Sequence, residues 1–341
     1  MTTFDHIPII DVSDLDQVDG GGIDSIVQQL RDVYGNVGFA YLVNHGIDRA
    51  LIDAVFQASA RFHALPREAK MVIELNELHR GFIPINTSTG KNSRLAVVTK
   101  PNQSESFIMM REAGTDDVAV RSGHYLAGPN QWPNELPGFR ETVIAYHDAL
   151  AGLAYKLCRA IALALETDVD AFAAAFAPPT TFLRLLYYPP QTPDPAGDLY
   201  GSAPHTDLGC ISILAQDDIG GLQVRNTAGE WIDAPRIPGS FLMNVGDMLH
   251  RWSNGRLLST PHRVINRSGS ARYSCPFFFD PAVTVKVEPL ESCVTPDNPR
   301  RFDGIVYGDF LRAELSAAYD RHERRSSAKG SANMKEFAEA Q

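Results

Sequence analysis

Three short segments of this chain predict both its fold and its chemistry: His205-Thr206-Asp207, Pro261-His262-Arg263-Val264 and Arg272-Tyr273-Ser274. Residues two apart on a β-strand point to the same side, so His205 and Asp207 can direct their side chains to one point. His262 starts a further β-rich segment and can supply a third ligand. Two neutral imidazoles and one carboxylate suit ferrous iron, and three ligands on one face of an octahedron leave three positions open. We therefore predict an iron site made of His205, Asp207 and His262.

Arg272 and Ser274 also alternate onto one face of a predicted strand. A guanidinium fork beside a hydroxyl donor matches the needs of a buried carboxylate. The pair therefore predicts a binding site for a carboxylate close to the metal.

Short β-rich segments begin at Thr181 and fill the second half of the chain. They are rich in β-branched and aromatic residues and are separated by Gly, Pro and Asp. The predicted strands cover residues 182–188, 210–216, 221–225, 230–233, 240–245, 262–266, 272–279 and 284–288. Eight strands at this spacing favour a double-sheet jelly roll.

The first half of the chain shows helical spacing instead. Apolar residues recur every three to four positions in 23–34, 50–63 and 139–166, which predicts three helices. Pro66 is expected to begin another short helix, because proline is tolerated in the first helical turn. In the second half of the chain, one more helix is predicted at 305–319. We expect an α+β, mainly β fold: a double-stranded β-helix (jelly-roll) core at 179–290, buttressed by helices of the helix-rich region 1–178, and a C-terminal helix within 300–320. Residues 1–320 are predicted to form a single catalytic domain, and the polar segment 321–341 a mobile tail.

The charge balance narrows the range of partners. The chain has 31 Lys and Arg against 41 Asp and Glu, and a net charge of −10 argues against nucleic acid or an anionic membrane surface as partner. The N-terminus lacks the pattern of a signal peptide, and charged residues interrupt the most apolar stretch, 142–165. Four cysteines without a C-x-x-C pair suit a reducing compartment, so we predict a cytoplasmic location.

Further motifs of the chain resemble one enzyme family. They are Ile7-Pro8-Ile9-Ile10-Asp11, Gly38-Phe39-Ala40-Tyr41-Leu42-Val43-Asn44-His45-Gly46-Ile47, Leu183-Arg184-Leu185-Leu186-Tyr187-Tyr188-Pro189, Gly220-Gly221-Leu222-Gln223-Val224 and Asn244-Val245-Gly246-Asp247. With the three segments above, the chain resembles the Fe(II)/2-oxoglutarate-dependent oxygenase superfamily, in the branch of isopenicillin N synthase. The Leu-Arg-Leu-Leu run is similar to that of thymine dioxygenase-like members.

The resemblance implies cofactors, roles and a reaction. His205, Asp207 and His262 would bind Fe²⁺, which 2-oxoglutarate chelates and O₂ then reaches. The far carboxylate of 2-oxoglutarate would contact Arg272, Ser274 and Tyr188. The family oxidises a C–H bond of a small molecule and releases succinate and CO₂; hydroxylation, or demethylation or desaturation derived from it, is the expected outcome.

Four residues are candidates for the substrate pocket: Arg184, Leu208, Phe278 and Phe107. Arg184 alternates onto the same strand face as Leu186, a position where many relatives have Asn. Phe278 lies four residues after Ser274, hence on the same face unless Pro276 introduces a bulge. Thymine dioxygenase-like members have an aromatic residue where this chain has Leu208, so a pyrimidine substrate does not carry over with the resemblance.

Three other functions stay open at this stage. An iron-dependent oxidase or cyclase of the same branch would use Arg272 and Ser274 for a substrate carboxylate and would not need 2-oxoglutarate. A zinc hydrolase could use the same three ligands, but no general-base carboxylate stands beside them. A non-catalytic metal-binding protein could share the fold. Formation of succinate from 2-oxoglutarate separates the favoured function from all three. The substrate and the oligomeric state do not follow from the sequence.

Overall fold

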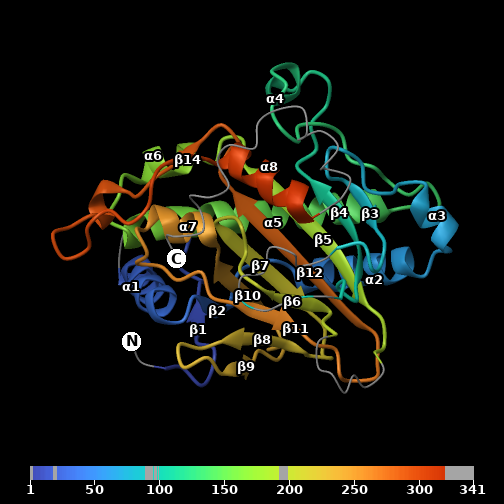
Figure 1. The fold of residues 1–341 in the computed structure, drawn as a ribbon, viewed down its shortest axis with the longest axis horizontal. Coiled ribbons are helices and arrows are strands. Elements are labelled where there is room, and N and C mark those ends of the chain that lie inside the picture. Colours follow the sequence, from blue (N-terminus) through green and yellow to red (C-terminus); the bar gives the residue numbers. More distant parts are fainter. Residues whose placement is uncertain are drawn as a thin grey trace.

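The computed structural model describes residues 3–17, 21–88, 95, 98, 100–191 and 199–318, and these form two stacked sheets covered by helices (Figure 1). The large sheet has the strand order β1-β2-β10-β7-β12-β5-β4-β3, and the small sheet the order β6-β11-β8-β9. The large sheet consists of β1 (Ile9–Asp11), β2 (Phe39–Val43), β3 (Gly81–Ile83), β4 (Glu105–Met110), β5 (Thr180–Tyr188), β7 (Ile211–Gln216), β10 (Ser240–Val245) and β12 (Arg272–Asp280). The small sheet consists of β6 (Ser202–His205), β8 (Leu222–Arg225), β9 (Trp231–Asp233) and β11 (His262–Val264).

Seven of the eight predicted strands belong to these two sheets, and the mainly β fold is confirmed. The eighth prediction, 284–288, was wrong as a jelly-roll strand: in the described part of the chain β13 (Lys286–Val287) pairs with β14 (Ile305–Val306) and with no strand of the two sheets. The jelly-roll strand that the pattern did not predict is β6. It contains Pro204 and shows no alternation of apolar and polar residues. Because β6 lies at an edge of the small sheet, it tolerates the missing N–H of a proline.

Helices cover the outer face of the large sheet. The predicted helices are present as α1 (Gly21–Asn36), α2 (Arg49–His63), α3 (Arg67–Met71), α5 (Phe139–Ala164) and α8 (Tyr307–Ala318). The sequence did not predict the short helices α4 (Val118–Arg121), α6 (Val169–Ala174) and α7 (Asp247–Trp252), nor the 3₁₀ turn at Glu291–Cys293. Helix α5 buries one stripe of apolar side chains, with α1 and α2 packed beside it, as its three-to-four spacing predicts.

The N-terminal region also contributes strands, which extend the large sheet at both edges. Strand β2 pairs antiparallel with β10, and β4 pairs antiparallel with β5. The helix-rich region and the jelly roll therefore share one hydrogen-bonded sheet, and the single catalytic domain stays a prediction. The predicted tail at 321–341 lies outside the described residues.

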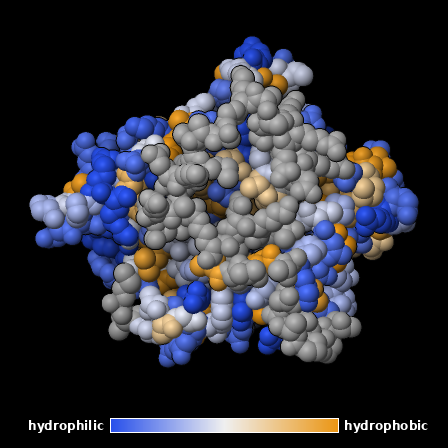
Figure 2. Space-filling view, viewed as in Figure 1, coloured by the Kyte–Doolittle hydropathy of each residue, from blue (hydrophilic) through white to orange (hydrophobic). Residues whose placement is uncertain are grey.

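The residues that the structure describes form two apolar cores. One fills the space between the large sheet and the helices, and the other, with Phe39, Tyr188, Val224 and Val264, lies between the two sheets. Among the described residues, no helix is both long enough and apolar enough to cross a membrane. Figure 2 shows hydrophobic residues scattered among hydrophilic ones on the described parts of the face turned to the viewer.

Candidate active site

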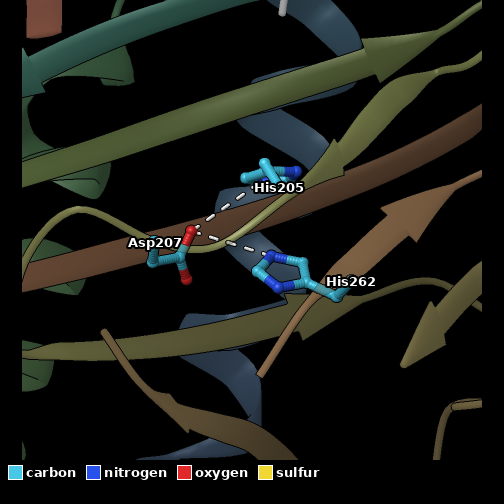
Figure 3. Close-up of side chains that lie close together, drawn as sticks. All are labelled: His205, Asp207 and His262. Atoms are coloured by element: carbon cyan, nitrogen blue, oxygen red, sulfur yellow. Dashed lines mark ion pairs between the residues drawn. The ribbon is translucent and has the colours of Figure 1, made fainter. Parts of the chain in front are cut away.

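The three predicted metal ligands converge between the two sheets (Figure 3). His205 ends β6 and His262 begins β11, and the two residues are direct partners in the antiparallel ladder. Asp207 follows β6 by two residues, and its Oδ1 lies 3.7 Å from His205 Nε2 and 3.6 Å from His262 Nε2. Within the described part of the chain, this is the one group of at least three His, Cys, Asp or Glu whose ligand atoms all lie within 4.8 Å of one another.

Backbone carbonyls fix the tautomer of both histidines. His205 Nδ1 donates to the carbonyl of Ala203 at 2.7 Å, and His262 Nδ1 donates to that of Thr260 at 3.3 Å. Each Nε2 therefore keeps its lone pair free for a metal. Burial, and next the neighbouring His262, lower the pKa of His205 to about 4. His205 is thus a neutral ligand near pH 7.

Asp207 offers one oxygen to the metal because its other oxygen is already engaged. Asp207 Oδ2 accepts hydrogen bonds from Ser212 Oγ at 2.5 Å and from Asn244 Nδ2 at 2.7 Å. Burial acts to raise the pKa of Asp207, but the two histidines and these hydrogen bonds outweigh it, so the pKa is lowered. Neither Ser212 nor Asn244 was a predicted site residue, although Asn244 stands in one of the quoted family-like motifs.

Arg272 is a fully buried cation that is only partly satisfied. Its Nε donates to the carbonyl of Gly220 at 2.7 Å, and its Nη2 donates to Gln216 Oε1 at 3.2 Å. Its Nη1 has no hydrogen-bond partner among the residues that the structure describes. A buried donor without an acceptor is costly, and a carboxylate is the group that best satisfies a guanidinium. The predicted carboxylate site therefore fits an acid bound between the sheets.

Ser274 and Tyr188 stand beside this cation. Ser274 is two residues from Arg272 on the same strand and is 1% exposed. Tyr188 is the cross-strand partner of Arg272, and its ring centre lies 4.7 Å from the guanidinium carbon. The ring faces the cation, which confines the guanidinium against the sheet.

Arg184 and Phe278 share the face of the large sheet that carries Arg272. The pairing of β12 with β5 keeps one register across Pro276, so no bulge turns Phe278 away. Phe278 is also paired with Ser212, which bonds to the metal ligand Asp207. Both expected orientations are therefore present.

Arg184 is close enough to the metal site to affect its electrostatics. After burial and His262, the positive charge of Arg184 also lowers the pKa of His205. Its Nη2 donates to Ser106 Oγ at 2.9 Å, and within the described part of the chain its buried Nε has no hydrogen-bond partner. Leu208 directly follows Asp207 and is partly exposed.

Phe107 does not lie with the other pocket candidates, so that prediction was wrong. It pairs with Leu185, whose side chain lies on the helix-covered face, opposite to that of Arg184. Its ring packs 5.3 Å from that of Phe62 and 5.1 Å from that of Phe139, and Phe107 is fully buried. Phe107 therefore belongs to the core between the sheet and the helices.

Sequence comparisons identify the family. Residues 179–281 match the 2OG-Fe(II) oxygenase superfamily, and residues 7–135 match the N-terminal region described as non-haem dioxygenase in morphine synthesis. The 2-oxoglutarate-Fe(II) type oxidoreductase hxnY of Emericella nidulans is 35% identical over 93% of this chain and 91% of its own. The chain belongs to the 2OG-Fe(II) oxygenase superfamily. The homoarginine-6-hydroxylase 2-ODD-C23 of Glycine max is 34% identical over 92% of this chain and 97% of its own.

Solved structures of the family have the same fold. A full-length Neurospora crassa enzyme, solved in complex with 2-oxoglutarate and thymine, is similar with a TM-score of 0.79 at 29% identity, covering 91% of this chain and 96% of that one. A 2OG-Fe(II) oxygenase family protein from Caulobacter crescentus gives a TM-score of 0.79 at 31% identity, covering 92% and 100%. This chain is accordingly a 2-oxoglutarate-dependent dioxygenase that uses Fe²⁺, 2-oxoglutarate and O₂.

Proposed function

We propose that this enzyme oxidises a C–H bond of a small molecule that presents a carboxylate or carbonyl oxygen to Arg184. In this proposal His205, Asp207 and His262 hold the iron, and Arg272, Ser274 and Tyr188 hold the far carboxylate of 2-oxoglutarate. Arg184, Leu208 and Phe278 line the substrate side of the site. The unpartnered Nη1 of the buried Arg272 is the observation that carries the 2-oxoglutarate assignment.

The side chains bind and orient, and the bound cofactors perform the oxidation. Iron, with 2-oxoglutarate and O₂, supplies the oxidising chemistry that replaces C–H by C–OH and releases succinate and CO₂. Asp207 is held in one orientation by Ser212 and Asn244, so it presents Oδ1 to the metal. Arg272 determines how far 2-oxoglutarate enters between the two sheets, because it forms a charge-assisted hydrogen bond with the far carboxylate. Leu208 and Phe278 provide apolar surface that excludes water.

The charge of Arg184 supports the choice of substrate class. Its buried Nε lacks an acceptor, and a substrate oxygen would complete its hydrogen bonds. A cationic group placed there would be repelled by the guanidinium. Thymine, which is bound to the Neurospora enzyme, has carbonyl oxygens of the kind proposed, and the carboxylate of an amino acid such as homoarginine would also serve. Hydroxylation, demethylation and desaturation are all compatible with this placement.

An anaerobic titration tests the cofactor assignment. Metal-free protein receives Fe²⁺ and then 2-oxoglutarate, while the visible absorption band of a 2-oxo acid chelated to ferrous iron is recorded. Arg272→Ala should raise the Kd for 2-oxoglutarate by roughly 30-fold or more, because one partner of a buried charge pair is removed. The matched control is Arg159→Ala, which removes an exposed ion pair with Asp170.

Both outcomes are informative. If Arg272→Ala and Arg159→Ala bind 2-oxoglutarate equally well, the carboxylate site lies elsewhere and Arg272 is free for a substrate acid.

The substrate class is tested separately by 2-oxoglutarate-dependent succinate formation. The test compounds come in pairs, in which the carboxylic acid group of one is replaced by an amine in the other. Stimulation by the amines but not by the acids would contradict the role given to Arg184.

The proposal includes a cytoplasmic location, with no nucleic-acid or membrane partner. All four cysteines are free and buried, which suits a reducing compartment. Fractionation of cells that express the chain checks this, and recovery in the membrane or secreted fraction would contradict it.

A further inference from the structure

The two segments that carry the metal ligands are connected by a residue that is not itself a ligand. Asp247, the first residue of α7, accepts a hydrogen bond from Thr206 Oγ1 at 3.2 Å through its Oδ2. Its Oδ1 accepts one from Ser259 Oγ at 2.6 Å. Thr206 stands between the ligands His205 and Asp207, and Ser259 stands three residues before His262. One carboxylate thus joins both ligand segments.

The backbone at the start of α7 is attached to the same loop. The N–H groups of Gly246, Asp247 and Met248 donate to the carbonyls of Cys210, Asp207 and Gly209 at 2.9, 2.8 and 2.9 Å. A Cβ at Gly246 would lie 2.3 Å from the carbonyl oxygen of Gly209 and 2.9 Å from that of Asp207. The close approach therefore requires glycine at this position, and it holds the Asp207 loop against α7.

On the other side, backbone groups provide most contacts of the segment that leads to His262. At the start of this segment, the N–H of Leu258 donates to the carbonyl of Tyr34 at 2.8 Å. Val245 forms a bridge with Ser259, and Thr260 Oγ1 donates to the carbonyl of Val37 at 2.8 Å. Between Ser259 and His262 the chain passes through Pro261, which has no N–H to donate, although its carbonyl accepts a hydrogen bond from the Arg225 N–H at 2.8 Å. The Asp247 carboxylate adds a side-chain link from this segment, through Ser259, to Thr206 of the Asp207 loop.

We propose that Asp247 is a positioning residue for the iron site, which fixes the spacing between the Asp207 loop and His262 before the metal binds. The inference rests on the assignment of His205, Asp207 and His262 as ligands, but it does not depend on where 2-oxoglutarate binds. Residues that hold metal ligands in place typically change metal affinity about 10- to 100-fold when they are removed.

The test is the Kd for Fe²⁺ in the absence of 2-oxoglutarate, measured anaerobically by competition with a chromophoric chelator. Asp247→Ala should raise this Kd by about 10- to 100-fold. Thr206→Val and Ser259→Ala each remove a single hydroxyl at nearly constant shape and should each give part of that rise. The matched control is Ser240→Ala, because Ser240 Oγ donates only to the carbonyl of Ile237, at 2.8 Å.

A double-mutant cycle separates positioning from a general structural role. Because both hydroxyls act through one carboxylate, adding Thr206→Val and Ser259→Ala to Asp247→Ala should raise the Kd no further. A structural role alone would lower the Tm of the metal-free protein and leave the Kd of the folded protein unchanged. The proposal is overturned if Asp247→Ala and both hydroxyl variants bind Fe²⁺ as tightly as Ser240→Ala does. If Asp247→Ala does not fold, the two hydroxyl variants decide.

Failure of the ligand assignment itself would be recognised independently. His262→Ala measured in the same assay should lose most of its Fe²⁺ affinity. If it does not, the triad is wrong, whereas loss in His262→Ala with no change in the Asp247 series rejects only the positioning role.

Discussion

Replacement of the buried carboxyl of Asp280 by an amide should stabilise the protein, and by more as the pH rises. Asp280 ends β12, is 3% exposed, and accepts hydrogen bonds from the Cys210 N–H and from the Tyr307 hydroxyl, both at 2.7 Å. Burial, opposed by these hydrogen bonds, raises the pKa of Asp280 from 3.8 to about 7. Asp280→Asn has nearly the same shape, and its amide oxygen can still accept from Cys210.

The sign of the effect follows from proton binding. Between pH 4 and pH 7 the folded protein holds a proton on Asp280 more tightly than the unfolded chain does, so stability is lost as the pH rises through this range. The two pH units between 5 and 7 correspond to about 2.7 kcal/mol at 1.36 kcal/mol per unit. The asparagine variant lacks this dependence. The difference in free energy of unfolding between the variant and the parent protein should therefore grow by about 2 to 3 kcal/mol from pH 5 to pH 8. For a chain of this length, this corresponds to about 4 °C in Tm.

Urea unfolding of metal-free protein at several pH values measures this difference. All other titrating groups are common to both proteins, so the gap between the two curves isolates Asp280. Asp170→Asn, at an exposed carboxylate on α6, controls for the loss of one negative charge. A gap that stays constant from pH 5 to pH 8, or that narrows with rising pH, would contradict a raised pKa of Asp280.

Three further substitutions test the site itself. His262→Ala should abolish iron-dependent succinate formation, and retained activity would remove His262 from the triad. Arg184→Leu should lower the rate with an acidic substrate by roughly 30-fold or more, while the Kd for 2-oxoglutarate stays within about twofold; equal loss of both would place Arg184 at the cosubstrate. Leu208→Ala should change the order of preferred substrates in a succinate assay without weakening 2-oxoglutarate binding, and an unchanged order would exclude Leu208 from the pocket.

The parts of the site that could be predicted from the sequence depend on short-range spacing. His205 and Asp207 are two residues apart, as are Arg272 and Ser274, so the period of a strand decides their common direction. The partners of Asp207 could not be predicted in this way. Ser212 and Asn244 reach it only because β7 and β10 are neighbours in the large sheet, and the order of strands in a sheet is not contained in the spacing of residues.

The wrong prediction for Phe107 has the same origin. Alternation in β4 separates Phe107 from Ser106, but it does not tell which of the two faces the iron site. Pairing with β5 decides this, because Ser106 stands beside Leu186 on the face of Arg184, whereas Phe107 stands beside Leu185 on the helix side. The strand β6 was not predicted for a different reason, since an edge strand with Pro204 needs neither alternation nor a full set of N–H donors.

The two arginines on the inner face of the large sheet, Arg272 and Arg184, differ in how deeply they are buried. Each has one buried nitrogen for which the described residues provide no acceptor, Nη1 in Arg272 and Nε in Arg184. Arg272 is fully buried, is fixed by Gly220 and Gln216, and faces the ring of Tyr188. The N–H groups of its Nη1 can therefore point in only one direction. Arg184 is partly exposed, and among the described residues the hydrogen bond of its guanidinium goes to Ser106. A rigid, enclosed cation suits a cosubstrate that is always the same acid, and a less confined cation near His205 suits the group that differs between substrates. Under the proposed function, 2-oxoglutarate binding at Arg272 would not depend on the substrate, and relatives could accept other substrates when only the residues around Arg184 differ.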